Sequence, residues 1–332
     1  MPITLAESKV GMADKVYDQV IDEFRRDSFL LDKLVFDNAI SPGTGGSTLV
    51  YGYQQLKSPS TAKVRKINEE YAPSEAKREK KTAEAKVMGG SFEIDRVIQD
   101  TSGALDEMAF QLKDKIKATT NYFHNCVING TSESSGAGFE VDTFDGLKKL
   151  LANTDTAYTS AVDISSSSLV DSNYNAFLDE VDAFLRKLDG KPTMLLMNSK
   201  MLTKMTSIAR RAGYYSRTET ALGTVVDMYN GIPMIDAGQY YNGSKTVDVI
   251  EVTTPTTSAW GTTAIYAINI GLDGFHGISP QGDKVVKTFL PDMTQPGAVK
   301  KGEVELIAGV VLKNTKKAGV LKDIKIEPKS VE

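Results

Sequence analysis

The sequence has few of the residues from which catalytic and metal sites are commonly built. Its 332 residues include a single cysteine, Cys126, and only two histidines, His124 and His276. One cysteine excludes an intrachain disulfide and fits a reducing compartment. Two histidines are too few for a typical imidazole-based zinc or iron site. His124 and Cys126 stand two positions apart in a helical pattern, so they point to different faces and form no catalytic dyad.

Long apolar runs, a secretion signal and a basic excess are also missing. The longest apolar runs, such as Met194–Met197, are far too short to span a bilayer. The N-terminus has no basic segment followed by an apolar one. We therefore expect no membrane partner, and synthesis in the cytoplasm. The formal net charge of -4 argues against a dedicated nucleic-acid binder.

The composition itself is that of a folded protein, with 41% hydrophobic and 25% charged residues. Helical and strand patterns follow one another without regular βαβ alternation, which predicts an α+β fold. The stretch from Ser102 to Asn129 carries an apolar stripe and predicts a helix of about seven turns. Further helices are predicted at 173–188 and after a cap at Asn198 or Ser199. The second half is dominated by strand patterns.

A very polar segment interrupts the first half of the chain. Between residues 57 and 86 there are nine lysines or arginines and five glutamates. The segments on either side, Thr48–Leu56 and Val87–Ile98, have strand composition, so we expect them to form an extended hairpin. A hairpin with so little apolar surface is marginal alone in water, and we expect another surface to support it.

No motif predicts an active site. The segment Gly43–Thr48 (GTGGST) lacks the lysine and spacing of a phosphate-binding loop and precedes a strand, so it is interpreted as a hinge. Asp179, Glu180 and Asp182 are expected to form the solvated face of a helix. We therefore expect no enzyme activity, no catalytic residues, no cofactor and no metal, and a structural or binding role.

Four stretches, in this order along the chain, carry a resemblance. They are FLRKLDGKPTMLLMNSKMLTKM (Phe184–Met205), YNGIPMIDAG (Tyr229–Gly238), AIYAINIGLDGFHGISP (Ala264–Pro280) and VELIAGVVLKNTKKAGVLKDIKI (Val304–Ile326). Before them come an arm, a glycine-rich hinge, the polar hairpin and the long helix. This order resembles the major capsid proteins of tailed bacteriophages with the Hong Kong 97-type fold, over essentially the whole chain.

The resemblance implies a division of the chain into parts. These are an N-terminal arm (1–44), an extended hairpin called the E-loop (45–92), a peripheral domain with a long spine helix (93–140), an axial domain (141–285), and the closing strands and C-terminus of the peripheral domain (286–332).

The resemblance also implies a function. Subunits would form pentamers and hexamers that close into the icosahedral head of a virion around double-stranded DNA, which they would touch weakly and without specificity. The E-loop would lie across the neighbouring subunit, whose surface would support it. The expected inter-subunit contacts are Lys57, Arg65, Lys66, Lys77, Arg78, Lys81, Phe24 and Phe29.

Further partners follow from the same resemblance. Some relatives carry a long helical leader that serves as a scaffold, whereas this sequence starts almost directly at the arm. We therefore expect a separate scaffolding protein, or prior processing, and a portal. Some relatives cross-link a hairpin lysine to an asparagine of a neighbour; Lys57 and Asn314 are conceivable partners, but no motif supports the pair, and we expect no cross-link.

Two alternatives stay open at this point. An encapsulin-like nanocompartment shell shares the fold and encloses an enzyme; the long hairpin and the arm favour the phage protein. A soluble enzyme would need a pocket of converging polar groups, for which the sequence carries no motif.

Overall fold

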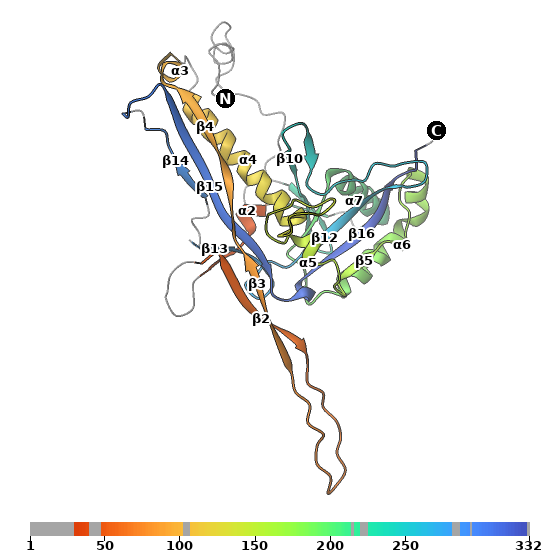
Figure 1. The fold of residues 1–332 in the computed structure, drawn as a ribbon. Coiled ribbons are helices and arrows are strands. Elements are labelled where there is room, and N and C mark those ends of the chain that lie inside the picture. The colour runs from red at the N-terminus through yellow and green to blue at the C-terminus, as the bar shows by residue number, and fades with distance from the viewer. Residues whose placement is uncertain are drawn as a thin grey trace.

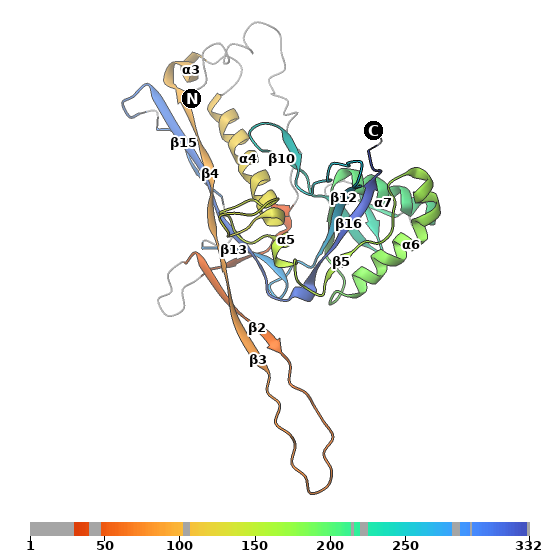
Figure 2. The same ribbon diagram turned by 45° about the vertical axis from the view of Figure 1, so that its right-hand side comes forward.

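The computed structural model describes residues 30–39, 48–101, 107–213, 216–219, 225–280, 286–292 and 294–330. Within them, helices and strands are mixed as predicted for an α+β protein (Figure 1). A compact body built on one sheet lies beside an elongated sheet, and a thin hairpin projects away from both (Figure 2). Phe24, Phe29 and most of the predicted glycine-rich hinge lie outside the described residues.

The body is a seven-stranded sheet with two helices on one face. Its strand order is β5-β16-β12-β6-β9-β8-β7. The helices α6 (Ser167–Arg186) and α7 (Ser199–Ala212) bury residues such as Phe177, Phe184 and Met205 against it. The strands are β5 (Ala157–Thr159), β16 (Ala318–Glu327), β12 (Gly261–Ile268), β6 (Met194–Met197), β9 (Ile232–Asp236), β8 (Val225–Tyr229) and β7 (Ser216–Glu219).

The elongated sheet is organised around β15 (Val299–Leu312). One edge of β15 pairs along ten residues with β4 (Lys86–Asp95). Its other edge pairs with β13 (Phe275–Ser279) and β14 (Val286–Phe289), and β1 (Phe36–Asn38) adds a parallel strand beside β13. Helix α4 (Glu107–Asn129) packs across one face of this sheet (Figure 1).

Helix α4 confirms the predicted long helix where it is described. Its 23 residues give a length of about 35 Å. The fully buried residues lie in its second half, where Phe123, Val127 and Ile128 join the core between the two sheets. His124 and Cys126 are buried in the same region. Ser102, the predicted cap, lies outside the described residues.

The predicted pairing of the hairpin was wrong. The strand from 48–56 is β2 (Val50–Ser58), but it pairs with β3 (Lys77–Glu84) and not with residues 87–98. The latter form β4 and the start of α3 (Arg96–Thr101). Within β4, Met88, Phe92 and Ile94 are buried, so β4 belongs to a core sheet. The charged β3 can pair with β2 because the ladder uses backbone groups alone.

One predicted solvated residue is buried. Asp179 is exposed on α6, whereas Glu180 is 8% exposed. Its carboxylate accepts hydrogen bonds from Ser160 Oγ at 2.6 Å and from the backbone N–H of Ala161 at 2.7 Å. Glu180 lies three residues after Phe177 and therefore shares the inward face of the helix. The strand-to-helix connection passes over that face and supplies the donors.

The remaining elements are short. They are α2 (Leu30–Lys33), α5 (Leu147–Leu150), β10 (Gln239–Tyr241), β11 (Thr246–Asp248) and the 3-10 turn η2 (Thr315–Lys317). Of the helices in the described part of the chain, none combines the length and the apolar character needed to cross a membrane.

Candidate assembly surface

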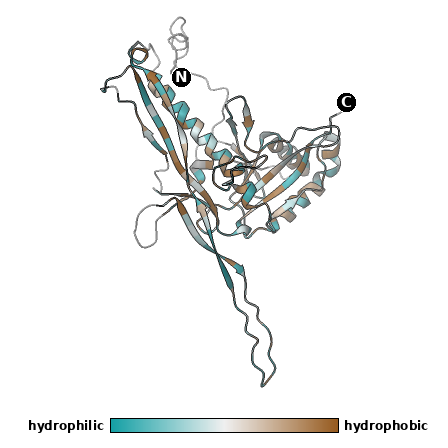
Figure 3. Cartoon of the chain, in the orientation of Figure 1, coloured by the Kyte–Doolittle hydropathy of each residue, from teal (hydrophilic) through white to brown (hydrophobic). Residues whose placement is uncertain are grey.

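The hairpin arm, defined as residues 50–84, is the most exposed part of the described structure. Strands β2 and β3 lead into a connection, residues 59–76, in which every residue is exposed. Figure 3 shows its strands mostly in the colours of polar residues, unlike the alternating strands of the sheets. At its tip, Val64 is 100% exposed, Ile67 90% and Tyr71 63%. Large apolar side chains in such exposure are typical of a surface that meets a partner.

Four of the predicted contact residues lie on the strands of the arm. Lys57 Nζ lies 3.9 Å from Glu79 Oε2, with both side chains largely exposed. Arg78 Nη1 donates to Gln54 Oε1 at 3.4 Å, and Lys77 and Lys81 are exposed on the same strand. These contacts inside the arm are long and solvated, so they stabilise it little and leave its cations available to another surface.

The other two described contact residues lie in the connection. Arg65 donates to the backbone oxygen of Glu69 at 3.2 Å, and its guanidinium lies 5.4 Å from the ring centre of Tyr71. Lys66 is exposed beside it. The structure thus brings six predicted residues onto one arm. Asn314, considered for a cross-link, instead caps η2 by accepting from the backbone N–H of Lys316.

The root of the arm is held by residues that the sequence analysis did not single out. The Tyr51 hydroxyl donates to Asp37 Oδ2 at 2.7 Å, and the Tyr51 ring packs edge-on to His276 at 5.9 Å. The Lys313 ammonium lies 5.2 Å from the same ring, and Gln55 Nε2 donates to the Lys313 backbone oxygen at 3.0 Å. These residues come from β1, β2, β13 and the position directly after β15. The elongated sheet therefore sets the direction of the arm.

Burial favours the uncharged forms of the two rings at the root, Tyr51 and His276. Burial, with the Asp37 hydrogen bond and charge, raises the pKa of Tyr51 to about 12. Burial, with the Lys313 charge, lowers the pKa of His276. Tyr51 therefore keeps its proton and His276 stays uncharged. In the structure Tyr51, Tyr53 and Gln55 alternate inward along β2; the sequence alone shows only that Tyr51 and Tyr53 are two positions apart in a predicted strand.

The elongated sheet offers a second surface, its back face, on the side away from α4. Because side chains alternate along a strand, Met88, Phe92, Val304 and Leu306 face the helix and their neighbours face away. The back face carries Glu93, Glu303, Glu305, Lys287, Lys301, Val87 and Phe289. Val87 is 58% exposed and Phe289 49%. The face is therefore partly apolar and has a small acidic excess.

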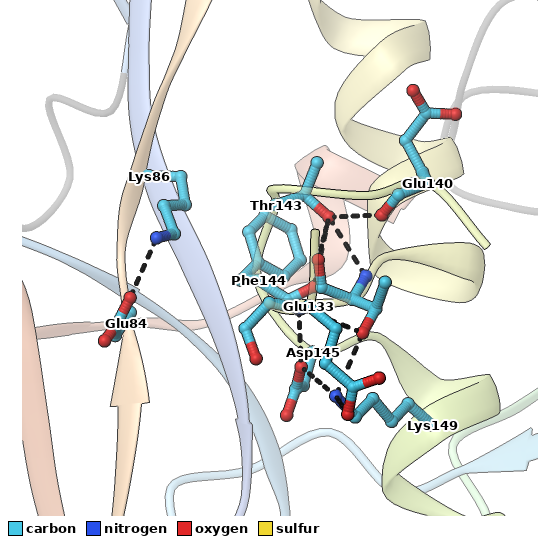
Figure 4. Close-up of polar contacts among 10 residues, drawn as sticks. Glu84, Lys86, Glu133, Glu140, Thr143, Phe144, Asp145 and Lys149 are labelled. Carbon is cyan, nitrogen blue, oxygen red and sulfur yellow. Dashed lines mark hydrogen bonds and ion pairs between the residues drawn. The ribbon is translucent and has the colours of Figure 1, made fainter. Parts of the chain in front are cut away.

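A third cluster is structural. Figure 4 shows Lys149 reaching toward Glu133 and Asp145, with Nζ–O distances of 2.8 and 3.3 Å. Burial acts to lower the pKa of Lys149, but the Glu133 hydrogen bond and the Asp145 charge raise it overall. The cluster ties the loop after α4 to α5. The same view shows the 2.8 Å pair of Glu84 and Lys86, where β3 passes into β4.

The described residues hold no group of three or more metal-ligating side chains. A cleft of about 390 Å³ lies over β12 and β16 beside α5. One of its charged residues, Lys148, is engaged within the chain: it donates to the Gly138 backbone oxygen at 2.7 Å and lies 4.8 Å from the Phe139 ring centre. The arrangement resembles a packing groove between layers more than a catalytic constellation.

Comparison with known proteins identifies a family and a shared fold. Residues 38–232, more than half of the chain, match the family described as the SU10 major capsid protein. No curated protein sequence matches the chain.

Among solved structures, an encapsulin complex of Synechococcus elongatus PCC 7942 is similar at a TM-score of 0.65 and 12% identity, over 100% of this chain and 99% of that one. A structure of Mycobacterium phage Ogopogo is similar at a TM-score of 0.56 and 13% identity, over 97% of this chain and 100% of that one. The capsid of Myoviridae phage XM1 is similar at a TM-score of 0.54 and 13% identity, over 97% of this chain and 99% of that one. At these identities the structures show a shared fold.

Proposed function

Because the chain belongs to the SU10 major capsid protein family, we propose that its copies form pentamers and hexamers that close into an icosahedral shell around double-stranded DNA. The role of a capsid subunit follows from the family, and the fold is that of phage capsid structures. The observation that carries the proposed mode of assembly is the hairpin arm. Its connection is exposed throughout and presents Val64, Ile67 and Tyr71 with no core beneath them.

We propose that the arm of one copy lies on the back face of the elongated sheet of its neighbour. The arm carries an excess of cations, and the back face has an acidic excess from Glu93, Glu303 and Glu305. Exposed ion pairs contribute only about 0 to 1 kcal/mol each. Burying Val64 or Ile67 contributes about 1.5 to 3 kcal/mol each. The apolar tip therefore supplies most of the affinity, and the charges orient the arm.

Other partners belong to the same proposal. We expect a portal and a separate scaffolding protein, and synthesis in the host cytoplasm before incorporation into the virion. DNA contact is expected to be weak and without sequence preference, because the chain carries a net charge of -4 and phosphate affinity grows with the number of cations that meet the backbone. No catalytic role is proposed.

A second candidate is an encapsulin-like shell. It is supported by the full-length similarity to the encapsulin complex of Synechococcus elongatus PCC 7942. The family match favours the capsid. The two roles differ in what the particle encloses, so particle contents decide between them.

Electron microscopy with light scattering on the purified full-length chain tests the proposal. We expect closed shells or capsomer rings, and we expect the double variant Val64→Ser/Ile67→Ser to stop at smaller species. The control, Leu272→Ser, makes the same kind of apolar-to-serine change at a residue that is 50% exposed in the turn before β13, and it should assemble normally.

Three results would change the proposal. Normal shells from the tip variant would show that the tip is not the contact. A monomer or dimer under every condition, including coexpression with neighbouring phage genes, would overturn assembly. Shells that enclose a host enzyme would establish the nanocompartment.

A further inference from the structure

A cleft of about 510 Å³ lies at the opposite end of the molecule from the arm, where β16 finishes near the C-terminus (Figure 1). Its walls are the first turn of α6, one side of α7 and the end of β16. The side chains that reach it are mainly cations and hydroxyls. They include Lys200, Lys204, Arg211, Ser165, Thr203 and Ser207.

The three cations lie on one face of α7. Lys200, Lys204 and Arg211 are spaced by four and seven residues, which places them above one another along the helix. The hydroxyls of Thr203 and Ser207 fall between them on the same face. The lining contains one carboxylate, Glu327. The cleft is thus a positively charged concavity within an acidic chain.

Contacts inside the chain hold these cations in place and leave donor capacity. Lys200 Nζ lies 2.6 Å from Glu327 Oε1, and Arg211 Nε donates to Asp171 Oδ1 at 2.6 Å. Lys204 Nζ donates to the backbone oxygens of Ile164 and Ser165 at 3.0 and 3.3 Å. An ammonium has three donors and a guanidinium five. Each group therefore keeps N–H donors beyond the contacts that position it.

Burial makes the charged form of Lys204 costly. Burial lowers the pKa of Lys204, and the Arg211 charge lowers it further, while the Asp163 and Glu327 charges act in the opposite sense. The charged form of Lys204 is therefore held at a net cost. An anion placed between Lys204 and Arg211 would favour the charged forms of both and so offset part of that cost.

The first turn of α6 adds to this arrangement. Ser166 caps the helix and Ser167 lines the cleft. The first backbone N–H groups of a 20-residue helix have no intrahelical acceptor, and the helix dipole places partial positive charge there. Two independent sources of positive potential, the α7 cations and the α6 terminus, therefore meet in one concavity.

We propose that this cleft binds an oxyanion of the phosphate class, held by Lys200, Lys204 and Arg211 and by the hydroxyl of Ser207. The Ser207 hydroxyl accepts a hydrogen bond from Arg211 and keeps its own proton for a ligand, whereas the Thr203 hydroxyl donates to the Ser199 backbone oxygen at 2.9 Å. The phosphate could come from a nucleic-acid backbone or from a free phosphate. The chemistry of the site is the same for both. This inference is independent of the assembly proposed above, because the cleft is complete within one chain.

Calorimetric titration of the chain with inorganic phosphate tests the site. A parallel titration with sodium chloride at matched ionic strength separates a specific site from general screening. We expect saturable phosphate binding that Lys200→Gln weakens about tenfold or more. The matched control is Lys245→Gln, an identical charge change at an exposed residue of the β10–β11 turn, which should leave binding unchanged. Thermal unfolding without phosphate checks that both variants fold.

A second variant, Ser207→Ala, removes one hydroxyl without changing charge and should also weaken binding. Phosphate effects equal to those of chloride, or equal in Lys200→Gln and Lys245→Gln, would overturn the proposal. A short DNA duplex provides the second arm. Binding of the duplex that is lost in Lys200→Gln would identify the backbone as the source; phosphate binding without duplex binding would identify a free phosphate. Either result supports the site.

Discussion

Replacing Tyr51 with phenylalanine should loosen the root of the hairpin arm without disturbing the core. The substitution removes one hydroxyl, whose hydrogen bond to the Asp37 carboxylate is 2.7 Å long. A hydrogen bond to a charged group contributes about 1.5 to 3 kcal/mol. The Asp37 side chain keeps a third of its exposure, so water replaces part of the lost contact. We therefore expect a loss of about 1 to 2 kcal/mol, confined to the joint between β2 and β1.

Hydrogen exchange of the backbone amides of β2 and β3 measures this loss. A change of about 1 to 2 kcal/mol corresponds to about 5- to 30-fold faster exchange through local opening. Tyr53→Phe is the control, because Tyr53 packs in the same apolar cluster. It should change exchange by less than about twofold. Equal exchange rates in the Tyr51 variant and the unmodified protein would refute the idea that this hydrogen bond anchors the arm.

Three further predictions concern the rest of the molecule. Glu180→Ala should lower the free energy of unfolding in urea by about 1 to 3 kcal/mol, because Ser160 and the backbone N–H of Ala161 lose their acceptor. Asp179→Ala should change it by less than about 0.5 kcal/mol. Equal effects of the two variants would contradict the buried role of Glu180. Burial lowers the pKa of His124 from 6.5 to about 3, so between these pH values the unfolded chain binds a proton that the folded chain does not. The free energy of unfolding should therefore fall by up to about 1.4 kcal/mol for each pH unit between about pH 6.5 and pH 3. His124→Gln should flatten that slope in acid unfolding. Assembled particles should dissociate more readily as salt rises from 0.1 to about 1 M, while the unfolding midpoint of the isolated subunit stays within a few degrees; a salt-independent particle would exclude a charged arm contact.

Local signals predicted the helices better than the pairing of strands. Asn198 caps α7 as expected, accepting from the Met201 N–H at 2.8 Å, because a cap needs only residues three positions apart. The start of α6 was missed by six residues, since Ser166 caps it within a serine run that carries no apolar periodicity. The partner of β4 could not be inferred, because β15 lies about 200 residues further along the chain.

The candidate surfaces divide in the same way. The cation-rich composition of the arm was visible in the sequence, as were the residues Lys57, Arg65 and Arg78 proposed for contacts. The joint that aims the arm was not, because Tyr51, Asp37 and His276 come together only in the folded chain. The back face was hidden for a similar reason. Its glutamates alternate with buried residues in β15, but a face exists only once β4 and β14 are placed beside it.

The root and the remainder of the arm respond to different forces, and this separation suits a protein that must fold before it assembles. The root is held by a short hydrogen bond and ring contacts among half-buried groups, where mobile ions screen poorly. Beyond the root the arm carries solvated charges and exposed apolar side chains that contribute little until a second surface covers them. A subunit can therefore fix the direction of its arm alone, while the strength of the contact stays adjustable by salt and by neighbours. A tip that already packed on its own subunit would lose that independence, because assembly would first have to break those contacts.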